Sequence, residues 1–562
     1  MESSDMDLSE MTTQQLVDKQ AQTNDDRVNK KILQEIVNRK PMFVEYVSKL
    51  AKLLTNMKDP DQARDTFTHS LKINDTNIDI WFYYINWSIE NDYILKKDEE
   101  KTKQIFEDAR SKVGTHPRAW KIWRKYADFE MLRDKKNTTN LIYYSALCAE
   151  LDDVDALIED YTKFIDANFD KLKETITNEN PPEFKNEKPN LLNHFLESNN
   201  DKSGFKTIIT RLAEKAKEQV EKRAPYENSI QIIDYDLSNS TNPVLAAEKE
   251  HWNKYLEWQK GENDVPKSAM LYKRMLIPFF DDFSVWKDYI DFVLTFQNSV
   301  DECRELYKYL RLNPISEDKH VNIQIYLDNA NFEEGQGQIK LARKIHRLIN
   351  TTLSPNYIKT ISEYIKFEKR AGSTKNTLDF LEEALEKARK NGDEFATIFL
   401  TVNTCRFHFA NDQDLDLLFD IFSDSVESFS NSKQLLINLI KLLETIQSSE
   451  NKLYSRSFGI IEKAVLDQKT TFEFEDRKQI ASSYLQWLKT SCKEQTYIEL
   501  VQGKFVAAEL VSQAAPDAVV QPINGDTSGQ IPASAETVAH VGEKRTAEDP
   551  LDESQKRQKT DE

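Results

Sequence analysis

Bulky aromatic side chains recur at intervals of three residues along most of this chain. The clearest copy is Trp123, Tyr126 and Phe129, followed directly by Glu130. On an α-helix, positions three and six residues further on lie about 60° and 120° away from the first, so three such rings cover an arc of roughly 120°. That arc is wider than a helix with a single neighbour needs. The pattern therefore predicts helices that are wedged between two other helices.

A second pattern lies C-terminal to each aromatic copy. A small residue is followed by a large apolar one four positions later and by another small one seven positions later, as in Thr102, Phe106 and Ala109. These positions share one helix face, and the small residues let a second helix approach closely. Each unit is therefore predicted to be a helix pair. The other residues that we assign to the repeat core are Trp81, Tyr84, Trp87, Trp252, Tyr255, Trp258, Trp286, Tyr289, Phe292, Tyr364, Phe367 and Glu368.

The units recur at a nearly constant distance. A period of about 34–42 residues, with one longer gap, separates the positions of the third aromatic residue, which are 87, 129, 258, 292, 332 and 367. Helix pairs that repeat with such a period are typical of an α-solenoid, in which each unit buries its apolar face against its neighbours. The predicted fold class is accordingly all-α, an α-solenoid of antiparallel helix pairs arranged in two arrays.

Changes in composition divide the chain into five segments. A Pro- and Asn-rich stretch interrupts the helical pattern, and both ends of the chain lack periodic apolar residues. Segments of that kind cannot bury enough apolar surface to offset their conformational entropy. We therefore predict a disordered leader at 1–30, an N-terminal array at 31–175, an insertion or hinge at 176–204, a C-terminal array at 205–502 and a disordered tail at 503–562.

Composition narrows the classes of protein that fit. Only 12 of the 562 residues are glycine, which disfavours sandwiches, barrels and phosphate-binding loops because these need many tight turns. The formal net charge is −19, so a grip on a nucleic-acid backbone along the whole surface is not expected. No apolar run reaches the length of about 18–20 residues that spans a bilayer, and the chain opens without a signal peptide. We expect no membrane association and a reducing compartment.

The sequence offers no constellation for catalysis. The four cysteines form no CxxC motif and are predicted to be buried thiols, and the histidines include no HExxH motif. The motifs GxSxG, GxxxxGK[ST] and GxGxxG are absent. Glu130 and Glu368 fall on the apolar arcs of their helices, where each needs a cationic or hydroxyl partner. We therefore predict a protein that is not an enzyme and has no catalytic residue, cofactor or metal site.

One stretch of the chain carries a local basic cluster, which we call the basic patch: Arg118, Lys121, Arg124 and Lys125. Arg124 lies between the two lysines on nearly the same side of the helix, which also carries Trp123. Such a surface suits RNA or an acidic segment of a partner protein. A solvated face that flanks a core helix explains it as well, and the sequence leaves both interpretations open.

The tail carries a bipartite nuclear-import motif. Two basic clusters on an extended chain fit two acidic grooves of an import receptor, and the spacer between them needs only enough reach. Acidic residues surround the clusters, which disfavours a general RNA-binding tail. The residues of the motif are Lys544, Arg545, Lys556, Arg557 and Lys559.

The two repeat patterns resemble those of half-a-TPR (HAT) proteins. W-x-x-Y-x-x-F-E in the first helix with A-R-x-x-F-E-x-A in the second is the HAT pattern, and the copies here lack the glycine of the related TPR motif. Among HAT proteins the chain looks most like the pre-mRNA-processing factor 39 family. That resemblance rests on the order of the arrays and on KRAPYENSI at 222–230 leading to HWNKYLEWQK at 251–260.

The resemblance implies a nuclear, non-enzymatic scaffold of the U1 small nuclear ribonucleoprotein that supports pre-mRNA splicing and 5′ splice-site recognition. It implies protein partners in that particle, limited contact with snRNA or pre-mRNA, and a homodimer or a heterodimer with a related HAT protein. Apolar helices at 430–445 and 480–488 fit such a dimer, although core packing explains them equally. The alternative is a HAT scaffold of the machinery for pre-mRNA 3′-end cleavage and polyadenylation.

Overall fold

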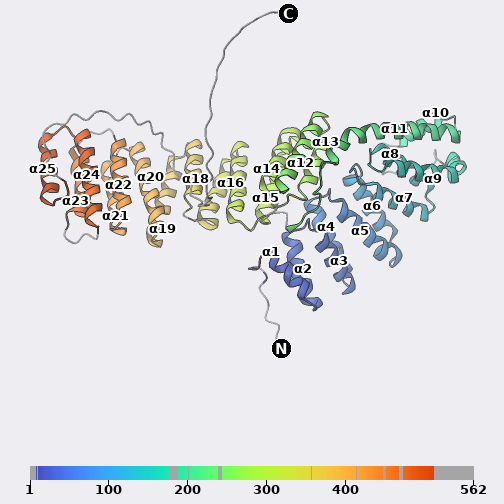
Figure 1. The fold of residues 1–562 in the computed structure, drawn as a ribbon, viewed down its shortest axis with the longest axis horizontal. Helices are drawn as coiled ribbons and strands as arrows, with labels where there is room; N and C mark the ends of the chain where they lie inside the picture. The colour runs from blue at the N-terminus through green and yellow to red at the C-terminus, as the bar shows by residue number, and fades with distance from the viewer. Residues whose placement is uncertain are drawn as a thin grey trace, which may run out of the picture. The chain divides into compact units, whose positions relative to one another are not determined.

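The computed structural model describes residue 8 and residues 10–175, 188–199, 201–237, 244–355, 357–412, 414–446, 451–467 and 472–511. Within them the chain forms 25 α-helices and no strand, and most successive helices within each unit pack against one another (Figure 1). The predicted all-α fold of stacked helix pairs is confirmed. None of the described helices combines the length and the hydropathy that a bilayer crossing requires.

The chain divides into two compact units between Phe429 and Ser430, and each is described by itself. The division falls inside the segment predicted as one C-terminal array. The first half of the first unit contains α1 (Thr13–Gln22), α2 (Asp26–Arg39), α3 (Val44–Asn56), α4 (Pro60–Ile73), α5 (Ile78–Ser88), η1 (Ile89–Ile94), α6 (Glu99–Val113), α7 (Trp120–Leu132), α8 (Lys136–Cys148), α9 (Val154–Thr175), α10 (Lys188–Glu197) and α11 (Lys202–Glu227).

The first unit continues with helices of similar length, joined by short turns. Among its described residues, three π-helical turns each extend the helix before them: η1 extends α5, and η4 and η5 extend two of the helices that are given next. The elements are α12 (Val244–Gly261), α13 (Val265–Met275), α14 (Phe283–Phe292), η4 (Val293–Gln297), α15 (Val300–Leu312), α16 (Lys319–Gly335), α17 (Ile339–Leu348), η5 (Ile349–Leu353), α18 (Ile358–Arg370), α19 (Thr374–Asn391), α20 (Glu394–Asp412) and α21 (Leu415–Ser428).

Helix α1 occupies part of the segment that the sequence predicts as a disordered leader. A reciprocal capping box starts it: the Thr12 hydroxyl accepts from Gln15 N at 3.2 Å, and Gln15 Oε1 accepts from Thr12 N at 2.8 Å. This arrangement satisfies two backbone donors at a helix start. Leu16 is fully buried in the core of the first unit. The prediction for 1–30 is therefore corrected from Thr13 onward, because tertiary contacts also hold this helix: Thr13 N donates to Glu317 at 2.8 Å, and Val17 packs against the core.

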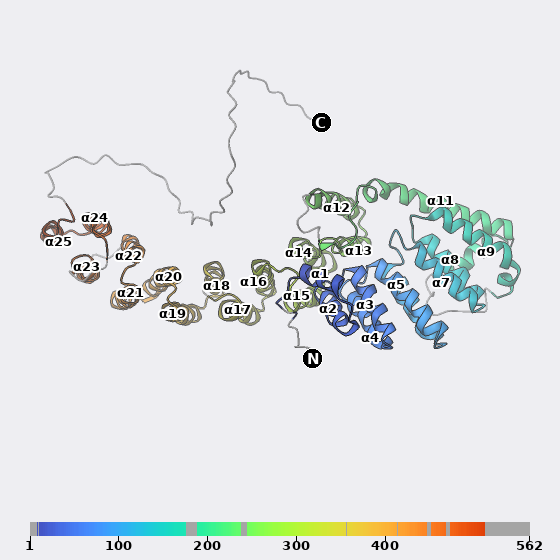
Figure 2. The same cartoon turned by 60° about the horizontal axis from the view of Figure 1, so that its bottom comes forward.

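Helix α11 crosses the boundary predicted at 204/205. Its first half packs into the same core as α10 and the N-terminal helices, through Phe205, Ile209 and Ala213 beside Phe195. In Figure 2 it runs along α8 and α9. The described part of the Pro- and Asn-rich stretch thus belongs to the first core, while 176–187 lies outside the described residues.

The N-terminal helices also contact a region more than 190 residues further along the chain. Asn74 Nδ2 donates to the Lys273 carbonyl at 2.6 Å (a separation of 199 residues), and Lys273 Nζ pairs with Asp75 at 3.0 Å. Met42 lies in the core formed by α12 to α16, and the Phe43 ring meets the Tyr235 ring edge-on at 5.5 Å. Both figures accordingly place α1 and α2 beside α14 and α15. Within the first unit the two predicted arrays therefore share a direct interface.

The second unit contains α22 (Lys433–Thr445), α23 (Asn451–Val465), α24 (Phe474–Ser491) and α25 (Gln495–Ala507). Leucines of α22 are buried, and the Tyr484 hydroxyl meets the Ser457 hydroxyl at 2.8 Å between α24 and α23. Helix α25 runs past 503, the predicted start of the tail, because Phe505 and Leu510 are fully buried. The rest of the tail, 512–562, lies outside the described residues.

The cysteines depart from prediction at one position. Cys303, Cys405 and Cys492 are buried free thiols, whereas Cys148 at the end of α8 is exposed. Burial raises the pKa of the Cys303 thiol to about 11, so this thiol stays protonated.

Candidate protein-interaction surfaces

The repeat-core aromatics form stacked pairs between consecutive helix pairs. The second helix of one pair places a ring on the tyrosine of the next pair's first helix: Phe106 stacks on Tyr126 with centroids 4.9 Å apart, and Phe67 stacks on Tyr84 at 5.1 Å. The sequence motifs therefore describe one recurring contact. Trp258 is half-buried, and the other aromatic residues of the repeat core are buried in the helix packing, so they are not available to bind a partner. The buried ones are Trp81, Tyr84, Trp87, Trp123, Tyr126, Phe129, Trp252, Tyr255, Trp286, Tyr289, Phe292, Tyr364 and Phe367.

The buried glutamates of the motif pair with arginines. Glu130 receives Arg133 Nη1 at 2.9 Å, and Glu368 receives Arg343 Nε at 2.5 Å and Nη2 at 2.8 Å. Both glutamates are about 1% exposed. Two-pronged arginine–carboxylate pairs satisfy a buried charge well. These carboxylates are therefore part of the helix packing and are not arranged to transfer protons to a substrate.

The basic patch is largely engaged with its own helices. Arg118 pairs with Asp79 at 2.5 Å, and Arg124 pairs with Asp160 at 3.3 Å. Lys125 Nζ lies 5.4 Å from the centroid of the Phe82 ring. Lys121 is exposed and makes no ion pair within the described part of the chain. The structure thus brings the four residues to one surface, where both arginines are paired and neither Lys121 nor Lys125 has a carboxylate partner among the described residues.

A groove of about 420 Å³ lies beside Lys121, between the first helices α5 and α7. Its wall includes Phe82 and Tyr83, and the Tyr83 side chain is 47% exposed. Asp79 and Asp153 also line it. An ammonium group beside exposed aromatic rings can bind one carboxylate or one phosphate, but the two aspartates oppose a run of them. The groove fits a short segment with one acidic group better than a nucleic-acid strand.

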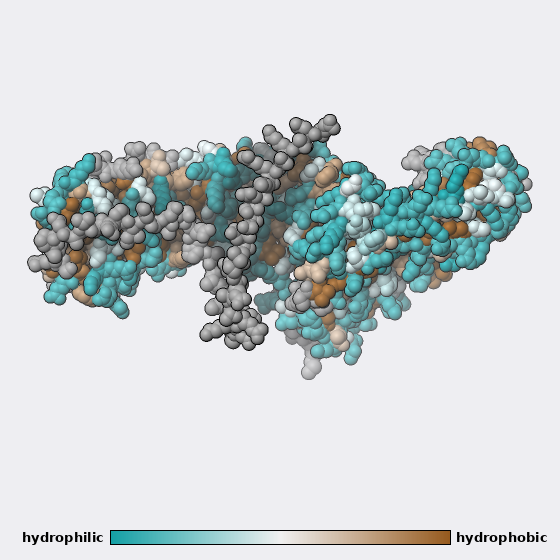
Figure 3. Space-filling model, turned by 45° about the horizontal axis from the view of Figure 1, so that its top comes forward, coloured by the Kyte–Doolittle hydropathy of each residue, from teal (hydrophilic) through white to brown (hydrophobic). Residues whose placement is uncertain are grey.

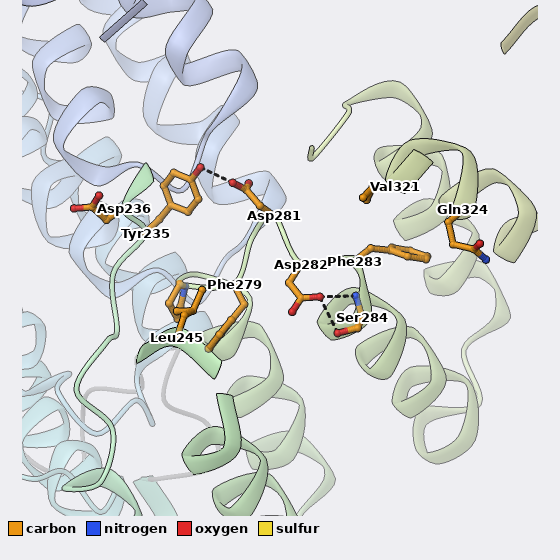
Figure 4. Close-up of a pocket in the computed structure, with 11 residues that line it drawn as sticks. Tyr235, Asp236, Leu245, Phe279, Asp281, Asp282, Phe283, Ser284, Val321 and Gln324 are labelled. Atoms are coloured by element: carbon orange, nitrogen blue, oxygen red, sulfur yellow. Dashed lines mark hydrogen bonds between the residues drawn. The ribbon is translucent and has the colours of Figure 1, made fainter. Parts of the chain in front are cut away.

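A second pocket, of about 400 Å³, lies near the contact between the N-terminal helices and α14 (Figure 4). The Tyr235 hydroxyl donates to Asp281 Oδ2 at 2.9 Å, and Asp282 accepts from Ser284 N at 2.9 Å. Burial and the neighbouring Asp281 carboxylate raise the pKa of Tyr235, so the hydroxyl stays protonated and keeps donating. Val321 and Gln324 close the far side in Figure 4.

Two of the three carboxylates that line this pocket, Asp281 and Asp282, have cationic partners. Lys40 Nζ lies 2.5 Å from Asp281 Oδ1, and Lys249 Nζ lies 2.6 Å from Asp282 Oδ2. The rest of the wall is mainly apolar, with Leu245, Phe279 and Phe283, and also includes Asp236 and Gln324. The pocket can therefore receive an apolar side chain. Elsewhere, hydrophilic residues cover most of the face drawn in Figure 3, and hydrophobic ones form separate patches.

The described residues contain no group of three His, Cys, Asp or Glu side chains that could hold a metal ion. The import-motif residues lie in the tail beyond residue 511, outside the described residues. Sequence reasoning missed both the pocket of Figure 4 and the partners of Lys40 and Lys249. No local signal could have found them, because Lys40 and Asp281 are 241 residues apart.

Comparisons with known proteins give the two halves of the chain a common family. A family model described as the PRP39 N-terminal HAT repeat matches residues 2–163, and one described as the PRP39 C-terminal HAT repeat matches residues 221–370. Pre-mRNA-processing factor 39 of Xenopus laevis is 21% identical over 445 residues, which cover 73% of this chain and 65% of that protein. For the Mus musculus protein of the same name the identity is 20%, over 73% of this chain and 63% of that protein.

A different HAT protein matches over a longer range. Cleavage stimulation factor subunit 77 of Arabidopsis thaliana is 20% identical over 84% of this chain and 58% of its own length. Among solved structures, a crystal structure of CstF-77 aligns with a TM-score of 0.39 and 11% identity, over 86% of this chain and 92% of that chain. The chain spans less than two thirds of the length of each of the three curated relatives.

Proposed function

The chain belongs to the PRP39 family of HAT-repeat proteins, and from this premise we propose that it is a nuclear, non-enzymatic scaffold in pre-mRNA splicing, acting within the U1 small nuclear ribonucleoprotein. The observation that carries the proposal is the match of the N-terminal and C-terminal PRP39 models, in that order, to two consecutive parts of one chain. The names of the relatives place those proteins in pre-mRNA processing.

The physical character of the chain supports a scaffold role. Stacked rings and buried ion pairs, such as Phe106 on Tyr126 and Arg343 with Glu368, hold successive helices in fixed relation. Grooves between first helices then present surfaces that a partner segment can enter. With a net charge of −19 and both arginines of the basic patch paired with aspartates, the contacts are made mainly with proteins and only to a limited extent with snRNA or pre-mRNA.

The proposal includes partners that follow from the family. The chain pairs with a second copy of itself or with a related HAT protein, binds protein components of the U1 particle, and enters the nucleus through an import receptor that reads the tail motif. The second unit offers exposed Phe474 and Leu500 for pairing, at 49% and 56% exposure.

A second candidate is a scaffold for pre-mRNA 3′-end cleavage and polyadenylation. The similarity to cleavage stimulation factor subunit 77 over 84% of this chain favours it. The two candidates predict different RNAs in the purified particle, so one experiment separates them.

The experiment is to tag the full chain, recover it from nuclear extract at moderate salt and sequence the RNA that co-purifies. We expect U1 snRNA to be enriched over the other spliceosomal RNAs, relative to an untagged extract. Enrichment of pre-mRNA 3′ ends would assign the protein to the cleavage machinery instead. Recovery of no RNA above background would overturn both candidates while leaving the family assignment intact.

A further inference from the structure

A third groove, of about 430 Å³, lies between the first helices α12 and α14 and differs in charge from the one between α5 and α7. We call it the acidic groove. Three carboxylates line it, Glu257, Asp288 and Asp291, against one ammonium group, that of Lys260. All three carboxylates are on exposed residues, and none forms an ion pair within the described part of the chain. The groove therefore holds more carboxylates than ammonium groups.

An aromatic row runs along the same groove. The Tyr272 ring contacts the Phe292 ring with centroids 5.0 Å apart, and Phe292 stacks on Phe296 at 5.2 Å and 26°. Phe296 stands in the π-helical turn η4, and its side chain is 56% exposed. π-Helical turns often occur at functional positions. The outer end of the row thus presents a ring face that nothing in the described structure covers.

A cation already lies on this aromatic row. Lys260 Nζ is 4.9 Å from the centroid of the Tyr272 ring at the inner end. Desolvation is the main cause that raises the pKa of Asp288 and Asp291. Lys249 and Lys260 oppose it at Asp288, and at Asp291 Lys287 opposes it while the carboxylates of Asp328 and Asp288 add to it. An added positive charge would relieve this crowding of carboxylates. The inner end therefore shows the kind of contact that the open outer end can still make.

We propose that the acidic groove binds an arginine-bearing basic segment of a partner protein. A guanidinium group can stack on the exposed Phe296 ring while it forms two parallel hydrogen bonds to a carboxylate, and an ammonium group cannot do both. Asp288 and Asp291 lie three residues apart on α14, so they are neighbours on one helix face. This proposal adds a class of partner, an arginine-bearing segment, to the scaffold role proposed above. It depends on that role only for the expectation that such a partner is met in the nucleus.

The test uses the full chain and three fluorescein-labelled dodecapeptides, which carry four arginines, four lysines or four glutamates among serines and glycines. Fluorescence polarisation at about 0.1 M salt gives each Kd. We expect the arginine peptide to bind about five- to tenfold more tightly than the lysine peptide, and the glutamate peptide not to bind. Equal binding of the arginine and lysine peptides, or binding of the glutamate peptide, would overturn the proposal.

Two groove variants and one matched control locate the site. Asp288→Asn with Asp291→Asn is expected to weaken arginine-peptide binding at least tenfold, and Phe296→Ala to reduce the preference for arginine over lysine about threefold or more. Glu214→Gln with Glu218→Gln, on the exposed face of α11, removes the same charge and is expected to leave the Kd within twofold. An equal loss in the control would show unspecific attraction to an acidic protein and overturn the site.

Recovery of U1 snRNA with the tagged chain separates this proposal from the proposed function. Loss of peptide binding in the wild-type chain together with normal U1 recovery overturns only the acidic groove. Peptide binding that maps to the groove without U1 recovery overturns only the assignment to the U1 particle. Because the substituted side chains are exposed, thermal unfolding of each variant is expected to match the wild type and thus to exclude misfolding as the cause.

Discussion

Lys40 and Asp281, 241 residues apart, form a close ion pair within the first unit. Lys40 Nζ lies 2.5 Å from Asp281 Oδ1 and 2.7 Å from the Ile315 carbonyl, and its side chain is 6% exposed. The rings of Tyr235 and Phe280 each lie 5.8 Å from the ammonium nitrogen. Lys40, at the turn between α2 and α3, therefore binds both the loop between α13 and α14 and the loop between α15 and α16.

We expect Lys40→Ala to lower the free energy of unfolding by roughly 2–4 kcal/mol, because it leaves the Asp281 carboxylate and the Ile315 carbonyl without this donor. Lys49→Ala is the matched control. Lys49 also pairs with a carboxylate, Glu45, but its side chain is 42% exposed, so we expect a change below about 0.5 kcal/mol. Urea unfolding followed by circular dichroism measures both. Equal effects of the two substitutions would contradict the inference that the buried ion pair of Lys40 with Asp281 stabilises the first unit.

The contacts between the two predicted arrays lead to a prediction about the stretch at 176–204. The sequence allows a hinge there, yet α11 packs with α8 and α9, and Lys273 pairs with Asp75 across the first unit. A protease site inserted at 181–184 and cleaved in the folded protein is expected to give two fragments that co-elute in size-exclusion chromatography. They should separate only in denaturant. Separation under native conditions would show that the inter-array contacts are too weak to hold the two parts together.

Local patterns and distant contacts differ in how visible they are in the sequence. The aromatic row of Trp123, Tyr126 and Phe129 was readable because a three-residue spacing within one helix determines which face is buried. The partner ring Phe106 was readable as well, since it lies in the neighbouring helix. The contact of Lys40 with Asp281 was not, because it depends on how small rotations between successive helix pairs add up along the array.

The candidate surfaces follow the same rule. The sequence placed Lys121, Arg124 and Lys125 on one side of a helix, and α7 carries all three, but it gave no sign that Arg118, in the turn before α7, pairs with Asp79. Likewise, the acidic groove combines Glu257 of α12 with Asp288 of α14, which no spacing connects. Even the leader contained a readable signal, the capping box of Thr12 and Gln15, which composition alone obscured.

Two arginine–glutamate pairs in consecutive repeats offer a matched test of burial. Glu368 receives two hydrogen bonds from Arg343, and their side chains are 1% and 22% exposed. Glu334 receives two from Arg370, and their side chains are 18% and 50% exposed. We expect Glu368→Gln to destabilise the protein by about 3 kcal/mol and Glu334→Gln by less than about 1 kcal/mol. Double-mutant cycles with Arg343→Gln and Arg370→Gln, measured by urea unfolding, give the coupling energies. If the coupling energy of Glu368 with Arg343 is no larger than that of Glu334 with Arg370, the inference that burial strengthens the first pair is wrong.

The tail motif makes a prediction that does not depend on the helical body. Replacing Lys544, Arg545, Lys556, Arg557 and Lys559 with alanine in a fluorescent fusion of the full chain is expected to shift it from the nucleus to the cytoplasm. The reason is that an import receptor binds both basic clusters through charge and aromatic contacts. As a control, neutralising the acidic residues between the clusters should leave the fusion nuclear. A nuclear fusion without the five basic residues would show that another signal, or a bound partner, brings the chain in.

His346 occupies the position that Phe67 and Phe106 hold in other repeats, and it stacks on Tyr364 with ring centroids 5.5 Å apart. Neither of its ring nitrogens has a hydrogen-bond partner, and the side chain is buried. Burial lowers the pKa of His346 to about 4, so the folded protein keeps the imidazole neutral. The unfolded chain, with an ordinary value of about 6.5, binds a proton there more readily. The contribution of His346 to the free energy of unfolding is therefore fully present above about pH 6.5 and is lost as the pH falls toward 4.

We expect the wild-type protein to lose roughly 2 kcal/mol more than His346→Phe when the pH is lowered from 7.5 to 5, because phenylalanine fills the same place without a titrating group. At pH 7.5 the phenylalanine variant should be at least as stable as the wild type, since it removes two buried nitrogens that lack partners. Urea unfolding at the two pH values measures the difference, and His320→Phe, at an exposed position, serves as the control. Parallel pH profiles for the wild type and His346→Phe would mean that the imidazole is protonated in the folded chain and that the stacked pair tolerates the charge.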